Sequence, residues 1–457
     1  MHGKQKRNPY NKMLRTLFLR FFIFGIVIVA LVGGATWVWH TLPAEDYVLY
    51  THATTGELHL YNPRTQTDRI ILDETPQYFY PSGNGRIAYI ESYGETNDIF
   101  VLDVLDPQAT PINVTNSPNT FEHFKGWNPQ GTHIVFLSGE TRTAHAMLTI
   151  WDGESFTDVT YGKFFEVEWN RTGDSLAFSV DMTPYEYRSV YVWQNNTLSL
   201  VTHPEIPNAR SNNPKIFWGP DNKLAISYAD SNLPYIYAIG YPHKTFIWQN
   251  ENVTYLENPN GADSIEALGW TDNDHLILIR SFERGDVHTH SVTVWSGETF
   301  GDNLPFYHRI AFTTDPESLQ FTSSGDIIYA QTFENGTSYL YVWDGYQSTH
   351  IGDIPALYRE LLSGNSQGYV AYIGREQHPS TITSTHLHIL HDEQEIDIEL
   401  RYQNYALALP NWSSGNYLSY EDDATPSDAT LYIWHPSGTQ TLDDVYTYWW
   451  LFGENQP

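Results

Sequence analysis

A short segment that recurs nine times constrains the fold of this 457-residue chain more than any other feature. Each copy alternates apolar and polar residues and then meets a turn dipeptide, which predicts a strand entering a tight hairpin. The mean spacing of about 47 residues is typical of repeats that stack into one array. The fifth position of the copies is occupied by Tyr61, Leu102, Trp151, Trp193, Trp248, Trp295, Trp343, Leu390 and Trp434.

Further strands are predicted around each copy. A turn rich in Gly, Asn or Asp, followed by a β-branched or aromatic run, precedes most copies, as in residues 128–136 and 170–178. Another short strand lies upstream of that turn, and a fourth follows the hairpin. Each unit is therefore predicted to be a four-stranded antiparallel meander. No segment between units has the length and periodicity of a helix, so the sequence indicates an all-β chain.

The two ends of the repeat region complement each other. The first unit begins at residues 47–51 and lacks an innermost strand, whereas residues 446–455 supply such a strand with no unit after it. Together they would complete one unit, close a ring and cover two sheet edges. This closure favours a single array over the three domains suggested by a prior of about 150 residues per domain.

The repeat resembles the WD-like repeats of TolB-type β-propellers. The turn is followed by a strand such as residues 134–136 (IVF) or 176–178 (LAF), and then by one such as residues 341–345 (YVWDG). The resemblance covers about residues 46–457 and implies a single large β-propeller of about eight or nine four-stranded blades, with its ring closed by the N- and C-terminal strands. Units 1, 2 and 8 lack the Trp, so we expect any degenerate blade among them. The resemblance implies no activity, because this repeat family includes scaffolds, receptors and enzymes.

An apolar segment precedes the repeats. Residues 21–39 carry no charged or amide side chain and would span about 28 Å as a helix, close to the ~30 Å hydrocarbon core. We therefore predict a single transmembrane helix over residues 21–41, preceded by a basic cytoplasmic stub at residues 1–20. The alternative is a cleaved signal peptide, with Gly33 and Ala35 as the small residues of its cleavage site. The cations that orient the helix are Lys4, Lys6, Arg7, Lys12, Arg15 and Arg20.

Charge and cysteine content exclude several functions. Residues 21–457 contain all 54 acidic side chains but only 18 of the 24 cations, so the region predicted to be extracytoplasmic is strongly acidic. Such a surface repels phosphate backbones, which argues against nucleic acid as a partner. The chain has no cysteine, which excludes a disulfide scaffold, a thiolate metal site and a cysteine nucleophile.

The connections of the meander predict where a ligand would bind. Turns between first and second strands, and between third and fourth strands, share one face and are tight. The opposite face carries the other connections, which include nearly all the long insertions, and long loops on a rigid scaffold commonly form binding sites. These insertions are residues 180–188, 228–243, 280–290, 374–385 and 421–429, with inter-unit links at 203–213 and 303–316.

Residues 228–243 are the most aromatic of these insertions. Their rings would stack on a sugar or a peptide, and the alternative is that they pack over the scaffold. The candidate binding residues are Tyr228, Tyr235, Tyr237, Tyr241 and His243.

Other motifs carry less chemistry. The repeated tryptophans are expected to pack between units. Residues 364–368 match G-x-S-x-G, but a strand, not the helix of a nucleophile elbow, is predicted after them. His288 with His290, and His386 with His388, could each form half of a zinc site, although we favour a structural role. No catalytic residue, metal site or cofactor is predicted.

The sequence thus favours a membrane-anchored extracytoplasmic β-propeller that acts as a non-catalytic protein- or glycan-binding module. The alternative is an extracytoplasmic hydrolase or lyase with carboxylates and histidines at the central channel. The identity of the ligand stays open.

Overall fold

The structure, a computed structural model, describes most of residues 46–451. Its longer gaps are at 183–187, 202–213, 230–242, 257–263, 298–307, 310–318, 356–361, 401–409 and 422–429, and residues 1–45 and 452–457 are also outside it. The chain divides into Met1–Glu45 and Asp46–Pro457, and all that follows concerns the second unit. None of the described residues belongs to a helix that could cross a membrane, and the predicted anchor at 21–41 lies outside them.

The described residues form β-strands almost throughout, with one 3-10 turn, η1 (Pro220–Asn222). The strands form nine four-stranded antiparallel meanders, here called blades 1 to 9. Blade 1 consists of β35 (Val445–Trp450), β1 (Val48–His52), β2 (Leu58–Asn62) and β3 (Thr67–Leu72). Blade 2 consists of β4 (Tyr78–Pro81), β5 (Arg86–Tyr93), β6 (Thr96–Asp103) and β7 (Ile112–Asn113). Blade 3 consists of β8 (Phe121–Trp127), β9 (Ile134–Gly139), β10 (Ala146–Trp151) and the first half of β11 (Phe156–Trp169). Blade 4 adds β12 (Ser175–Asp181), β13 (Ser189–Gln194) and β14 (Thr197–Val201) to the second half of β11.

The remaining blades repeat the same order, with the innermost strand first. Blade 5 consists of β15 (Lys215–Trp218), β16 (Leu224–Ala229), β17 (His243–Gln249) and β18 (Asn252–Tyr255). Blade 6 consists of β19 (Ser264–Trp270), β20 (Leu276–Arg284), β21 (Val287–Trp295) and β22 (His308–Arg309). Blade 7 consists of β23 (Leu319–Phe321), β24 (Ile327–Thr332), β25 (Thr337–Trp343) and β26 (Ser348–Pro355). Blade 8 consists of β27 (Leu362–Gly364), β28 (Val370–His378), β29 (Thr381–His391) and β30 (Gln394–Leu400). Blade 9 consists of β31 (Asn411–Trp412), β32 (Leu418–Glu421), β33 (Leu431–His435) and β34 (Gly438–Leu442).

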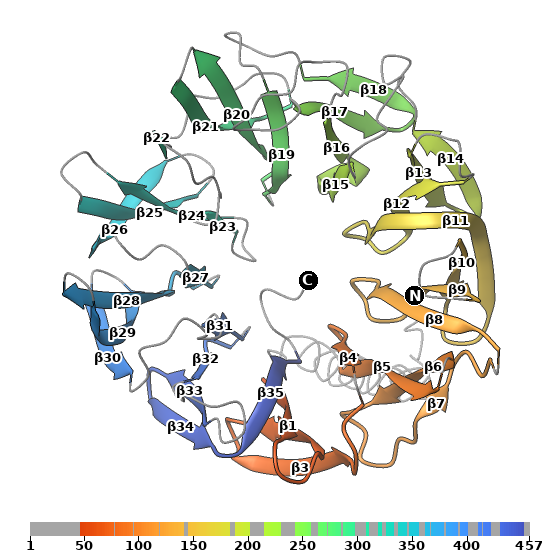
Figure 1. Cartoon of the computed structure of the whole chain (residues 1–457), viewed down its shortest axis with the longest axis horizontal. Coiled ribbons are helices and arrows are strands. Elements are labelled where there is room, and N and C mark those ends of the chain that lie inside the picture. Colours follow the sequence, from red (N-terminus) through yellow and green to blue (C-terminus); the bar gives the residue numbers. More distant parts are fainter. Residues whose placement is uncertain are drawn as a thin grey trace, which may run out of the picture. The chain divides into compact units, whose positions relative to one another are not determined.

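The blades form a closed ring (Figure 1). In the described part of the chain, nine hydrophobic clusters each join two consecutive blades, and one of them joins blade 9 to blade 1. Strand β35 pairs antiparallel with β1, from Val48 opposite Trp450 to Thr51 opposite Thr447. The predicted closure by the two ends of the repeat region is therefore confirmed. Blades 1, 2 and 8 are each four-stranded, so the expectation of a degenerate blade among them is wrong.

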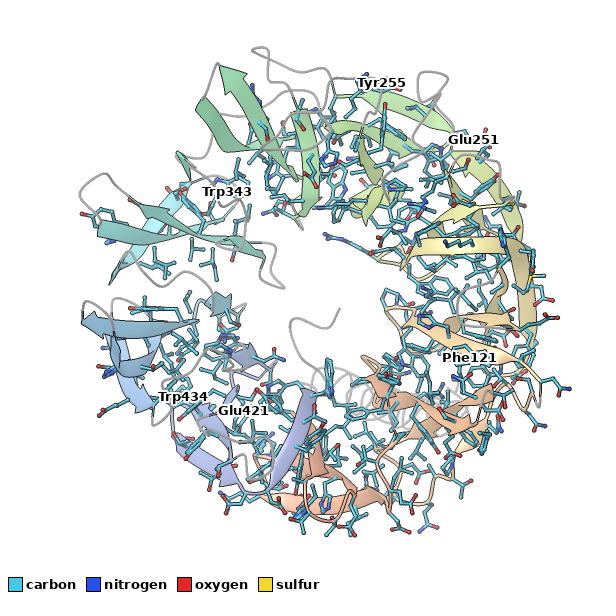
Figure 2. The ribbon with its side chains drawn as sticks, viewed as in Figure 1. Phe121, Glu251, Tyr255, Trp343, Glu421 and Trp434 are labelled. Atoms are coloured by element: carbon cyan, nitrogen blue, oxygen red, sulfur yellow. The ribbon has the colours of Figure 1, made fainter. Side chains whose placement is uncertain are left out.

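The repeated aromatic position packs between blades, as predicted. Trp151 belongs to the cluster of blades 2 and 3, and Trp295 to that of blades 5 and 6. Trp343 and Trp434, labelled in Figure 2, are 6% exposed and occupy the same place in later clusters. Leu390 and Leu102 replace the indole with a smaller apolar side chain at the same interface.

Five tryptophans at the ends of innermost strands tie those strands to the preceding blade. The indole nitrogen donates to a backbone carbonyl one blade back, so that a bulky apolar ring is buried without leaving its N–H unsatisfied. These bonds join Trp127 to Tyr80 (3.0 Å), Trp218 to Glu168 (3.0 Å), Trp270 to Phe217 (3.1 Å), Trp412 to Ser363 (3.3 Å) and Trp450 to Asn411 (3.1 Å).

Blades 3 and 4 share β11. The sequence predicts two separate strands there, the fourth of one unit and the first of the next, whereas the structure has one continuous strand. Its first half pairs with β10 and its second half with β12, and the register shifts between Phe164 and Val167. Gly162 lies at the crossing, where an added Cβ would come 2.4 Å from Val180 Cγ2 and 3.1 Å from the Asp181 carbonyl oxygen. Only glycine fits this close approach, which lets one strand serve both blades.

The predicted division into two faces is confirmed by hydrogen bonds. On the tight face, the Asn170 amide donates to Asn222 Oδ1 of the next blade (2.7 Å). On the opposite face, which we call the loop face, the turn after β1 meets the link before β35, where the Ala53 N–H donates to the Asp444 carbonyl (2.7 Å). Two insertions are not loops, however. Residues 280–290 and 374–385 extend strand pairs β20–β21 and β28–β29 into long hairpins, because their alternating Thr, His and Val or Ile residues continue the strand pattern.

Candidate functional site

A cluster of polar side chains lies on the loop face, where blades 5 and 6 meet. Lys215 begins β15, His243 begins β17 and Glu266 is the third residue of β19. Innermost strands start at the loop face, so Lys215 and Glu266 lie beside His243, the first residue of β17. We call this the Lys215–Glu266–His243 cluster.

Glu266 holds the cluster together. Its Oε1 lies 2.6 Å from Lys215 Nζ, and its Oε2 lies 2.9 Å from His243 Nδ1. Burial alone would raise the pKa of Glu266, but the hydrogen bonds and charges of His243 and Lys215 outweigh burial and lower it to about 2. The carboxylate is therefore ionised at neutral pH. Because it accepts from Nδ1, the imidazole has its proton on that nitrogen.

Hydroxyl groups fix the strands beneath the cluster. Ser227 and Thr245 hydrogen-bond each other (2.6 Å) across β16 and β17. Both also reach β19 of the next blade: the Ala267 N–H donates to Ser227 Oγ (2.7 Å), and Thr245 Oγ1 donates to the Ile265 carbonyl (2.9 Å). Since Ile265 and Ala267 flank Glu266 in sequence, this network sets the position of the carboxylate.

The hydrogen bonds of the cluster limit what each of its groups can do. Both oxygens of Glu266 already accept hydrogen bonds, one from the Lys215 ammonium group and one from the His243 imidazole, so the carboxylate is not placed as a general base. The His243 backbone N–H donates to Ser264 Oγ (2.7 Å), but no described hydroxyl is hydrogen-bonded to its imidazole as a nucleophile would be. The cluster presents an imidazole and an ammonium group, both held by the Glu266 carboxylate.

The structure describes two of the five predicted binding residues, and it places them in different surroundings. His243 lies in the cluster. Tyr228 is 4% exposed and packs in the hydrophobic cluster of blades 4 and 5, so the structure supports the alternative that this ring packs on the scaffold. Tyr235, Tyr237 and Tyr241 lie outside the described residues, as do the six cations of residues 1–20.

Sequence reasoning missed Lys215, Glu266 and Ser264. They are far from His243 in sequence and match no motif. A signal was present nonetheless, because the repeat alignment puts residues 215–218 and 264–270 on first strands of successive units, whose starts share the loop face. Lys215 and Glu266 are oppositely charged residues near the starts of these two strands, so the alignment predicts an ion pair between them.

A second unusual carboxylate lies on the inner wall of the ring. Glu168 is on the blade 4 half of β11, and its side chain reaches solvent. The surrounding protein nevertheless desolvates it, and this desolvation, with the neighbouring Glu166, raises the pKa of Glu168 to about 7. A carboxyl group with such a pKa can carry a proton at neutral pH.

The predicted histidine pairs do not form a described metal site. His386 Nδ1 lies 2.8 Å from Asp397 Oδ1, and His388 Nδ1 lies 2.7 Å from Glu395 Oε1, so the two imidazoles share one face of β29 and pair with β30. His288 and His290 lie on β21, opposite Glu283 and Ser281 in register. Across the residues that the structure describes, no three His, Asp or Glu side chains are placed to hold a metal ion.

The repeated meanders, the packing between them and the closing strand define a β-propeller. No protein-family model matches the chain, and no curated protein matches it either. Among solved structures it is similar to a eukaryotic initiation factor, with a TM-score of 0.58 and 12% identity over 90% of this chain and 99% of that one. It is also similar to Porphyromonas gingivalis dipeptidyl peptidase 4, with a TM-score of 0.54 and 14% identity over 80% of this chain and 59% of that one. TolB from Acinetobacter baumannii matches with a TM-score of 0.31 and 15% identity over 70% of this chain and 82% of that one. At such identities the likeness to the first two structures concerns the fold alone.

Proposed function

We propose that this protein is a single-pass membrane protein whose TolB-type propeller binds a protein or a glycan outside the cytoplasm, without catalysing a reaction. Residues 21–41 would cross the membrane, with the basic residues 1–20 in the cytoplasm. The loop face would hold the ligand, with Tyr235, Tyr237 and Tyr241 stacking on it beside His243.

The observation that supports binding is the saturated carboxylate of Glu266. Lys215 and His243 both bond to it, so the described part of the loop face offers polar groups held in place by an ionised carboxylate. Donors that are already held in place favour recognition, because little conformational entropy is lost when a ligand binds. The alternative, a hydrolase or lyase, draws on Glu168, whose raised pKa would suit a general acid.

Topology can be tested because the chain has no cysteine. Two single-cysteine variants are needed, Asn8→Cys in the basic stub and Thr65→Cys in the exposed turn between β2 and β3. In intact cells or spheroplasts, a membrane-impermeant maleimide is expected to label the Thr65→Cys variant alone, and both variants after permeabilisation. Labelling of the Asn8→Cys variant in intact cells, or failure to label the Thr65→Cys variant, would contradict the orientation.

Ligand binding can be tested on the loop-face tyrosines. Tyr235, Tyr237 and Tyr241 are replaced together by alanine, with Tyr161→Ala, 55% exposed on β11, as the matched control. The full-length chain is screened on a glycan array, and a photo-crosslinking residue at position 237 or 161 probes protein partners. We expect the triple variant to weaken binding at least tenfold, since each stacked ring contributes about 1 kcal/mol. Equal binding by both variants argues against the loop face, and conversion of the bound glycan would favour the enzyme.

A further inference from the structure

A cavity of about 370 Å³ lies between blades 4 and 5 on the tight face, opposite the Lys215–Glu266–His243 cluster. This volume is within the range of cavities that hold small ligands. Trp218 and Trp248 contribute apolar atoms to its lining, although both side chains are mostly buried, 7% and 8% exposed. Residues of three tight turns also line it, namely Asn195, Asn222, Asn250 and Glu251, and Figure 2 labels Glu251.

The lining is rich in groups that both donate and accept hydrogen bonds. It includes the amides of Gln194, Asn195 and Asn250, and the hydroxyl groups of Thr197 and Ser199. Among the described residues, none is hydrogen-bonded to these three side-chain amides, so their donors and acceptors are available to a ligand. The lining has one carboxylate, that of Glu251, and no Lys, Arg or His.

The turns that line the cavity keep side chains where glycine would be conformationally easier. Asn250 and Glu251 have φ angles of 48° and 67°, and Asn195 has one of 51°. Consecutive residues with positive φ form a type I′ turn, in which glycine meets no steric cost. The same connection in blades 3 and 6 does use glycine, at Gly153 and Gly297. A glutamate in the left-handed region is unusual, and here it places a carboxylate in the lining of the cavity.

We propose that this cavity binds a neutral saccharide. Each sugar hydroxyl donates one hydrogen bond and accepts others, which matches a lining of amides and hydroxyl groups, while C–H groups of the sugar can contact the accessible edges of Trp218 and Trp248. The Glu251 carboxylate and the lack of a cation disfavour phosphate, sulfate or carboxylate ligands. The many amides disfavour a wholly apolar ligand. The site does not depend on the function proposed above, because it lies on the other face.

The test is saturation-transfer NMR on the full-length chain, in a detergent without a sugar headgroup. The probes are glucose, galactose, N-acetylglucosamine and cellobiose. We expect saturation transfer from the protein to at least one of these sugars. For Glu251→Gly we expect the dissociation constant of that sugar to be at least tenfold larger. Because glycine relieves the left-handed backbone that Glu251 now adopts, this variant should unfold at the same temperature as the wild type or higher.

The matched control is Gln66→Gly, which relieves φ of 55° in the corresponding connection of blade 1, outside the cavity. It should gain similar stability and bind the sugar unchanged. If no probe shows saturation transfer, or if Glu251→Gly binds as tightly as Gln66→Gly, the proposal is overturned.

Discussion

Replacing Trp450 by alanine is expected to destabilise the folded ring by about 3–5 kcal/mol, the usual cost of truncating a buried tryptophan. Trp450 is 2% exposed and packs where blade 9 meets blade 1. Its indole nitrogen donates to Ser419 Oγ (2.9 Å) and to the Asn411 carbonyl (3.1 Å). Alanine would leave both a cavity and two unsatisfied acceptors at the interface formed by both ends of the repeat region.

The adjacent residue supplies the control for this experiment. Trp449 lies on the same strand but points to the other side and is 39% exposed. Trp449→Ala should cost clearly less than Trp450→Ala, because the Trp449 ring is already partly in solvent, although its edge still packs against Phe79 (6.4 Å between ring centroids). Urea denaturation of the full-length chain, followed by far-ultraviolet circular dichroism, measures both. Similar midpoints for the two variants would show that the closing interface contributes little to the stability of the ring.

Replacing Glu266 by glutamine is expected to lower the free energy of unfolding by about 2–3 kcal/mol at pH 7. Lys215 and His243 both bond to the Glu266 carboxylate, and glutamine removes its negative charge. The predicted effect depends on pH. The folded-state pKa of about 2 lies below the usual value of 4.5, so the folded protein binds fewer protons than the unfolded chain in that window. This stabilisation is complete above about pH 4.5 and is lost as the pH falls toward 2.

The stability of the glutamine variant should therefore fall less steeply than that of the wild type between about pH 4.5 and pH 2, because the variant has no carboxyl group at position 266 to protonate. Glu154→Gln, in an exposed turn, is the control and should change stability by less than about 0.5 kcal/mol. Denaturation midpoints between pH 2 and pH 8 give the three curves. An acid limb in Glu266→Gln as steep as that of the wild type would rule out the ion pairs as its source.

Much of the architecture could be predicted because its signals are local and repeated. A period of two along each strand, a turn dipeptide after it and a period of about 47 between units specify a meander and its number of copies. Closure also followed from the sequence, because 47–51 and 446–455 lack complementary parts of one unit. The long hairpins at 280–290 and 374–385 were missed because strand extension and loop insertion lengthen a repeat equally.

The site was predicted only in part for a related reason. His243 stood out because an aromatic insertion led to it. Glu266 and Lys215 did not, since a charge on a first strand has no meaning until its neighbour in the next blade is known. The packing of Tyr228 depends likewise on the facing surface of blade 4.

By itself, the sequence determined a ring of β-meanders, the interfaces that its tryptophans fill and the two faces to which its connections belong. Tertiary structure decided which polar side chains meet across those interfaces: the Lys215–Glu266–His243 cluster on the loop face, and the cavity between blades 4 and 5 on the tight face. The physical reason is that strand periodicity is written within each unit, whereas the positions of neighbouring sheets are set by side-chain packing between residues about one repeat apart.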